Sequence, residues 1–205
     1  RWLKDLVPVE MNSEEIAHRM TMAGLEAEGI EKIGIGWEKI YGGTVQTVEK
    51  HPNADRLVLA TITAGDIEQT VVTGAPNIEP GLKVALALVG ARLVDPYSEE
   101  PKTMTLKASK IRGVRSEGMA CSEKELGISD EHEGILILDP DAPEGMPLRE
   151  YLGDDVIEFG ITPNLVHAFS MVGLARELGA LANTPVTFPA LADLTSAPND
   201  QSLVE

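Results

Sequence analysis

Cysteine and aromatic residues are scarce in this sequence, and each shortage excludes a class of site. Cys121 is the only cysteine among 205 residues, so an internal disulfide and a zinc site built from several thiolates are both excluded. A lone cysteine fits a reducing compartment, and we expect a cytoplasmic protein. Aromatic residues make up 4% of the chain, which leaves few platforms on which nucleobases could stack.

Basic residues are also few, because 17 Lys and Arg stand against 33 Asp and Glu, for a net charge of −16. Affinity for nucleic acid depends largely on cations that neutralise phosphates, so a chain this acidic can bind a polyanion only through a local patch. No apolar run reaches the roughly 18 residues of a membrane span, and charged residues at once after Arg1 argue against a signal peptide. We expect the chain to be part of a longer protein.

Amphipathic helices are predicted near both ends of the chain. Asn12 followed by Glu15 indicates a capping box for a helix that ends at Gly24. Towards the other end, we predict a helix over 143–152, a strand over 156–161 and a helix that ends before Asn183. Neither end can bury the apolar face of its helix alone, so we expect the two to pack together as one discontinuous domain.

Between these ends, residues 40 to about 139 contain short β-type runs separated by Gly, Pro and Asn turn signals. Ser122, Glu125 and Gly127 predict one short capped helix. The predicted fold class is therefore α+β, with a five-stranded β-barrel and extra hairpins over 40–150. The barrel is inserted in a small helical domain of 1–39 plus 151–190, and 191–205 is expected to be a linker.

Three motifs in the middle region resemble the tRNA-binding OB-fold shared by several synthetase-associated proteins. They read HPNADRL (51–57), VVTGAPNIEPGLKV (71–84) and KIRGVRSEGMACSEKELGI (110–128). The flanks, RWLKDLV at the start and ITPN with the later SMVGLARELGAL, are similar to the N-terminal part of the β subunit of bacterial phenylalanine–tRNA ligase. One stretch departs from that family, because Leu165, Val166 and His167 follow ITPN where Arg-Pro/Ala-Asp is usual.

The resemblance implies a non-catalytic segment of a larger enzyme. The family is an α2β2 class II synthetase that joins phenylalanine to tRNA with ATP and magnesium. Its aminoacylation site belongs to the α subunit, and its editing site lies further along the β subunit. We therefore expect no catalytic residue, no metal and no cofactor in this chain. The expected partners are tRNA, the α subunit and the remaining β-subunit domains, with no membrane.

Lys102, Lys107, Lys110, Arg112 and Arg115 are the best candidates for RNA binding, since all five fall within fourteen residues. If all five met phosphates of looped RNA, log affinity would fall with log salt concentration with a slope of about −3.5. The alternative is a solvated edge strand, because lysines commonly guard sheet edges. The few aromatic residues suggest that any contact would be to the RNA backbone.

Four further residues complete the candidate set: His51, Asn53, Ser116 and Met119. The first two belong to a turn that Pro52 stiffens, and the last two to a glycine-containing bend. Each could contact RNA or simply shape the chain. Two other functions stay open, namely a free-standing dimeric tRNA-binding OB-fold protein and a barrel that binds only protein. The flanking helices argue against the first, and the acidity of the chain favours the second.

Overall fold

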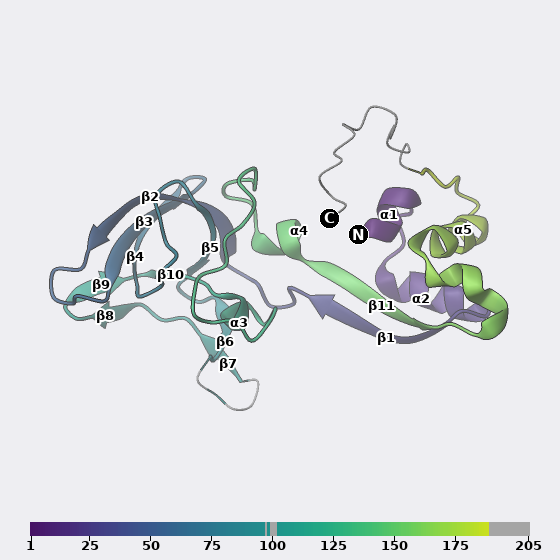
Figure 1. Ribbon diagram of the computed structural model, residues 1–205, viewed down its shortest axis with the longest axis horizontal. Helices are drawn as coiled ribbons and strands as arrows, with labels where there is room; N and C mark the ends of the chain where they lie inside the picture. Colours follow the sequence, from purple (N-terminus) through teal and green to yellow (C-terminus); the bar gives the residue numbers. More distant parts are fainter. Residues whose placement is uncertain (97, 99–101, 189–205) are drawn as a thin grey trace, which may run out of the picture. The chain divides into compact units, whose positions relative to one another are not determined.

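The computed structural model describes residues 1–96, 98 and 102–188. Contacts between residues divide the chain into two compact units, Arg1–Glu31 with the chain from Ile157 onward, and Lys32–Val156. The second unit is therefore an insertion in the first. The chain passes between them through two paired strands, β1 (Glu26–Ile33) and β11 (Asp154–Gly160) (Figure 1). The predicted linker over 191–205 lies outside the described residues.

The inserted unit is longer at both ends than the predicted 40–150, because residues on either side belong to its core. Trp37 is buried, and its Nε1 donates a hydrogen bond of 2.9 Å to the carbonyl of Leu126. Ile33, Tyr151 and Leu152 pack against the same cluster. Because these residues contact the core of the inserted unit, that unit extends from Lys32 to Val156.

The discontinuous unit is built from helices of both chain ends. Ile16 and Met20 of one helix share a buried cluster with Ala175 and Leu178 of another. The two apolar faces therefore cover each other, as neither end could manage alone. The helices are α1 (Trp2–Leu6), α2 (Ser13–Met22), the 3-10 helix η1 (Pro163–Phe169) and α5 (Met171–Ala182).

The residues at the predicted helix starts gave the correct first turn for α2 but not for the helix predicted over 143–152. Asn12 Oδ1 accepts the N–H of Glu15 at 2.8 Å, so the predicted cap of α2 is confirmed, while the Glu15 carboxylate pairs with Arg19 at 2.7 Å. The prediction of a helix over 143–152 is wrong in its first half. Helix α4 spans only Leu148–Leu152, because Gly145 has a φ of 79° and Pro147 stands at the cap position.

The predicted last helix is broken into η1 and α5 at Ser170. The Ser170 hydroxyl accepts the N–H of Gly173 at 3.0 Å and so caps α5. A Cβ on Gly173 would lie 1.7 Å from the carbonyl oxygen of His167, so only glycine allows this corner. In the stretch that departs from the family pattern, His167 Nε2 lies 2.7 Å from Glu177 Oε1 and links the two helices.

Among residues 1–96, 98 and 102–188, no single helix is long and apolar enough to cross a membrane. The pair Pro163–Phe169 and Met171–Ala182 meets the length and composition requirement only together, across a bend of 102°.

The inserted unit is an antiparallel five-stranded sheet in the order β10-β5-β2-β3-β4, curled into a nearly closed barrel (Figure 1). Its long strand pairs with β5 through Ile40–Thr44 and with β3 through Thr44–Lys50, and a bulge after Val45 bends it between the two. The predicted α+β fold with an OB-fold-like barrel is confirmed. The strands are β2 (Ile40–Lys50), β3 (Val58–Ala64), β4 (Ile67–Thr73), β5 (Lys83–Leu88) and β10 (Gly118–Ala120).

The barrel interior is filled by β-branched and leucine side chains from alternate positions. Ile62, Val71, Val84 and Leu86 are all fully buried. After β10 comes α3 (Glu123–Leu126), where Ser122 and Glu125 form the predicted capping box and Gly127, with a φ of 71°, ends the helix. These local signals determine where the chain leaves the barrel.

A polar contact fastens the loop after residue 139 to the outside of the barrel. The Thr44 hydroxyl donates to the Glu144 carboxylate and accepts from Lys83 Nζ at 2.8 Å. Hydrogen bonds from Thr44 and Thr63, with the Lys83 charge, hold the pKa of Glu144 below its ordinary value. The lowered pKa means that the ionised carboxylate stabilises the folded state.

We therefore expect Glu144 to contribute to stability above pH 4.5, its ordinary pKa, and to lose this contribution as pH falls through its lower folded-state value. The Glu144→Gln variant should unfold at a lower temperature than the wild type at pH 7. The two melting temperatures should converge as the pH approaches 3. Thermal unfolding of both proteins from pH 3 to 7 checks this, and a difference that does not change with pH would contradict it.

Candidate nucleic-acid interface

Three of the predicted cations lie on one hairpin of the barrel unit, formed by β8 (Ser109–Ile111) and β9 (Val114–Ser116). Its loop is Arg112-Gly113, with φ values of 48° and 98°, as a two-residue type I′ turn requires. Lys110 stands directly opposite Arg115 in the register. Both are exposed, whereas Ser116 on the other face is buried, so the two cations point away from the barrel.

The tip of this hairpin is held by the turn that contains the first predicted motif. His51 is buried, and its Nε2 lies 3.1 Å from the carbonyl oxygen of Ile111. The Asn53 side-chain amide donates to the carbonyl of Arg112 at 2.9 Å, and the Asn53 backbone N–H donates to His51 Nδ1 at 3.0 Å. We call Lys110, Arg112 and Arg115 the hairpin cations. The structure thus brings His51 and Asn53 to the hairpin that carries these cations.

Ser116 and Met119 serve the barrel rather than its surface. The buried Ser116 hydroxyl accepts the N–H of Val72 at 3.2 Å and donates to the carbonyl of Gly118 at 2.9 Å. It joins the end of the hairpin to β4, and Ser116 is only 4% exposed. Met119, half-buried on β10, pairs with Ala87 and packs against the cluster around Trp37.

The two remaining predicted cations lie elsewhere on the barrel unit. Lys102 leads into β7 (Thr103–Thr105), which pairs with β6 (Arg92–Val94), and Lys107 lies between β7 and β8. Both are exposed. Figure 1 shows the β6–β7 hairpin apart from the β8–β9 hairpin. Lys110, Arg112 and Arg115 therefore share one hairpin, whereas Lys102 precedes a different pair of strands.

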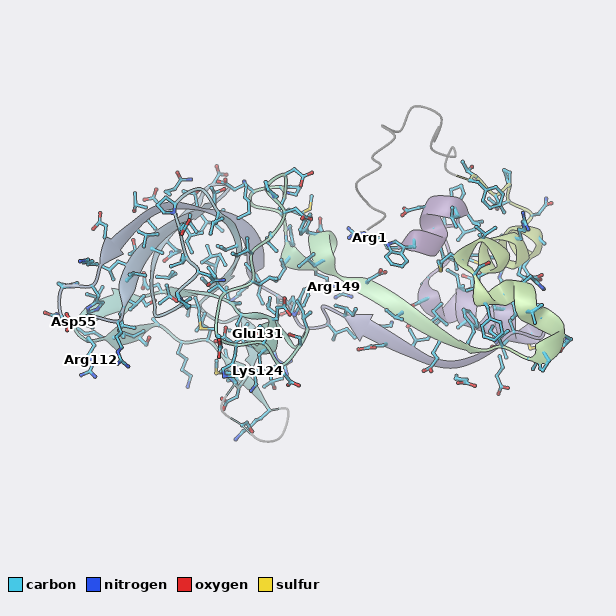
Figure 2. All side chains as sticks on the ribbon, in the orientation of Figure 1. Arg1, Asp55, Arg112, Lys124, Glu131 and Arg149 are labelled. Atoms are coloured by element: carbon cyan, nitrogen blue, oxygen red, sulfur yellow. The ribbon has the colours of Figure 1, made fainter. Side chains whose placement is uncertain are left out.

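The turn that contains His51 and Asn53 is called the clamped turn below. Two exposed cations that the sequence did not single out, Lys50 and Arg56, lie on either side of it in the chain. No pattern within the sequence places them near the hairpin, because some sixty residues separate the turn from it. Asp55 and Arg112 lie at the same end of the barrel unit (Figure 2). The Arg115–Glu117 ion pair, at 2.5 Å, has side chains 72% and 45% exposed, so it costs little to open for a phosphate.

The hairpin and the turn that holds it offer few groups for base stacking. Neither 50–57 nor 109–116 contains Phe, Tyr or Trp, and the one imidazole, of His51, is buried. In the part of the chain that the structure describes, no three His, Cys, Asp or Glu residues gather as a metal site. Burial raises the pKa of the Cys121 thiol far above its usual range, which leaves it unreactive.

Comparison with known families gives this geometry a context. Residues 40–147, which include the whole barrel and the hairpin, match a family model described as "Putative tRNA binding domain". The chain belongs to this tRNA-binding domain family. The matched span of the tRNA-binding domain ends within the barrel unit, before β11, and includes the clamped turn at its beginning.

Sequence relatives of the tRNA-binding domain extend beyond the barrel. The phenylalanine–tRNA ligase β subunit of Dehalococcoides mccartyi is 50% identical over 181 residues, which are 88% of this chain and 22% of that relative. The same subunit of Protochlamydia amoebophila is 45% identical over 190 residues, or 93% of this chain and 23% of the relative. The chain thus spans about a quarter of the length of the curated relatives it matches. The predicted resemblance to this subunit is confirmed.

One solved structure also resembles the tRNA-binding domain. The crystal structure of a MetRS-related protein from Pyrococcus horikoshii covers 52% of this chain and 84% of its own, at 23% identity and a TM-score of 0.36.

Proposed function

We propose that the chain is the non-catalytic N-terminal segment of a phenylalanine–tRNA ligase β subunit and binds tRNA weakly through its hairpin cations. The observation that carries this proposal is that 50% identity extends over 88% of the chain, so it includes the helical unit as well as the barrel. A free-standing tRNA-binding module would need only the barrel. The discontinuous helical unit supports a segment that is built into a larger subunit.

In this proposal the chemistry of aminoacylation takes place elsewhere. ATP and magnesium would be used by the whole enzyme, and the helical unit would brace the barrel against the α subunit and the remaining β-subunit domains. The segment would work in the cytoplasm. Its own contribution would be to hold tRNA while the other parts act on the acceptor end.

The hairpin cations favour contact with phosphates over recognition of bases. Lys110, Arg112 and Arg115 are exposed on one small element, and neither the hairpin nor the turn over 51–57 contains Phe, Tyr or Trp. Contacts to phosphate and sugar position an RNA without reading its sequence. We therefore expect tRNA to be held by the shape and charge of its backbone.

A titration of the chain with tRNA at several salt concentrations tests the proposal. With three phosphate contacts the slope of log affinity against log salt should be about −2, and the dissociation constant at about 0.15 M salt should exceed about 1 µM. Fluorescence anisotropy of labelled tRNA provides both numbers. Tight binding that salt does not weaken would contradict the proposal.

The second candidate function is a barrel that binds only protein, and the net charge of −16 favours it. The same titration separates the two functions. With three phosphate contacts, the affinity for tRNA should be about tenfold higher at about 0.05 M salt than at about 0.15 M. Absence of binding at the lower salt concentration would support the second function.

A further inference from the structure

We infer that His51 and Asn53 are positioning residues, which hold the β8–β9 hairpin so that its cations meet RNA together. The inference rests on the proposed function, since it assigns these residues a part in tRNA binding. It differs from that proposal in placing neither side chain against RNA. Both act through the carbonyl groups of Ile111 and Arg112.

The hairpin needs such support because its own ladder is short. Each strand has three residues, and a two-stranded hairpin of this length is not stable alone in water. Within the described residues, β8 and β9 form a sheet of their own, separate from the five-stranded sheet. The chain joins β9 to the barrel strand β10 through Glu117, so it is the position of the rest of the hairpin that depends on side chains.

Side-chain hydrogen bonds fasten the hairpin at both ends. At its base, the Ser116 hydroxyl bonds to the backbone of Val72 in β4. At its tip, the carbonyls of Ile111 and Arg112 accept from His51 and Asn53. The tip and the turn also pack closely, since a Cβ on Gly113 would lie 3.2 Å from Asn53 Nδ2. Lys110 and Arg115 lie between these two attachments, and Arg112 stands at the tip itself.

The partners of His51 fix the tautomer of its ring. The Asn53 backbone N–H can only donate, so Nδ1 must be the acceptor without a proton. The Ile111 carbonyl can only accept, so Nε2 must carry the proton. A neutral His51 with the proton on Nε2 is therefore the form that closes the clamp.

Two substitutions separate the two hydrogen bonds of His51. His51→Gln places an amide N–H near the former Nε2 position, and so keeps a donor for Ile111 while it loses the acceptor for Asn53. His51→Asn places an amide oxygen near the former Nδ1 position, and so keeps the acceptor while it loses the bond to the hairpin. The two variants have the same charge and similar polarity, so each is the control for the other.

The experiment uses the whole chain of 205 residues, labelled with 15N, in the wild type and in both variants. The heteronuclear NOE of the amides of 110–114 reports whether the tip is ordered, and the ring 15N shifts of His51 report its tautomer. We expect a tip as rigid as the barrel strands in the wild type and in His51→Gln, and a mobile tip in His51→Asn. In His51→Asn the affinity for tRNA should fall about tenfold, since re-ordering even one residue of backbone costs about that factor.

The possible failures are distinguishable. A rigid tip in His51→Asn, or a mobile tip whose affinity equals that of the wild type, would overturn the inference and leave the proposed function intact. A wild type that binds no tRNA would overturn the proposed function itself. Unchanged amide signals of β2 and β5 in both variants show that the barrel is folded. The result that supports positioning is a rigid tip and wild-type affinity for tRNA in His51→Gln, together with the loss of both in His51→Asn.

Discussion

Replacing the hairpin cations together, as Lys110→Ala, Arg112→Ala and Arg115→Ala, should weaken tRNA binding by about fiftyfold at about 0.15 M salt. Each phosphate contact contributes about 0.7 to the salt slope, or about fourfold in affinity at that salt concentration relative to 1 M. The three fourfold factors multiply to about fiftyfold. The magnitude of the salt slope should also decrease by about 2. Anisotropy titrations of the wild type and the triple variant over a range of salt concentrations measure both effects.

A matched triple variant controls for the loss of charge. Lys4→Ala, Arg19→Ala and Arg149→Ala remove the same number of exposed cations from other parts of the chain. Their effect on affinity should stay within about twofold, because charges beyond a Debye length of about 8 Å from the RNA are screened. Equal losses in the two triple variants would show that affinity follows net charge rather than the hairpin.

The double variant Lys102→Ala with Lys107→Ala tests the remaining members of the predicted cation group. Both side chains are exposed but lie outside the β8–β9 hairpin. We expect a smaller loss of affinity than for the hairpin cations. A loss as large as that of the hairpin triple variant would extend the interface to the β6–β7 side of the barrel.

Leu86→Ala should lower the free energy of unfolding of the barrel unit by about 3 to 5 kcal/mol, the upper range for a buried leucine. Leu86 is 0% exposed, and its strand β5 lies between β10 and β2. Backbone ladders on both sides prevent the neighbours from closing the cavity. Urea denaturation followed by the fluorescence of the buried Trp37 measures the change.

A nearby partly exposed residue provides the control for this substitution. Val89 follows β5 directly and is 41% exposed. Val89→Ala should change the free energy of unfolding by no more than about 0.5 kcal/mol. If Leu86→Ala lost as little as Val89→Ala, the interior of the barrel would not be packed as the structure has it.

Local chemistry made much of the fold predictable. The capping residues Asn12 and Ser122 lie where their helices begin, because a cap is defined within four residues of chain. The barrel followed from short β-type runs between turns. The prediction over 143–152 was wrong because glycine and proline within it acted through backbone angles that helical periodicity does not reveal.

The site was less predictable because distance in sequence misrepresents distance in space. Five cations within fourteen residues suggested one patch, and the structure places three of them on the β8–β9 hairpin and Lys102 before a separate pair of strands. His51 and Asn53 were predicted as RNA contacts, and no local pattern indicates their hydrogen bonds to hairpin residues some sixty positions away. The burial of Ser116 depends on Val72, which no pattern around Ser116 indicates.

The central claim is that tRNA meets this chain at the β8–β9 hairpin and the turn clamped to it. Backbone amide shifts recorded while unlabelled tRNA is added to the 15N-labelled chain test it most directly. The account predicts that the largest changes fall within 109–116 and 50–57 and disappear at about 1 M salt. Shifts concentrated in the helical unit, or spread evenly over the barrel, would contradict it.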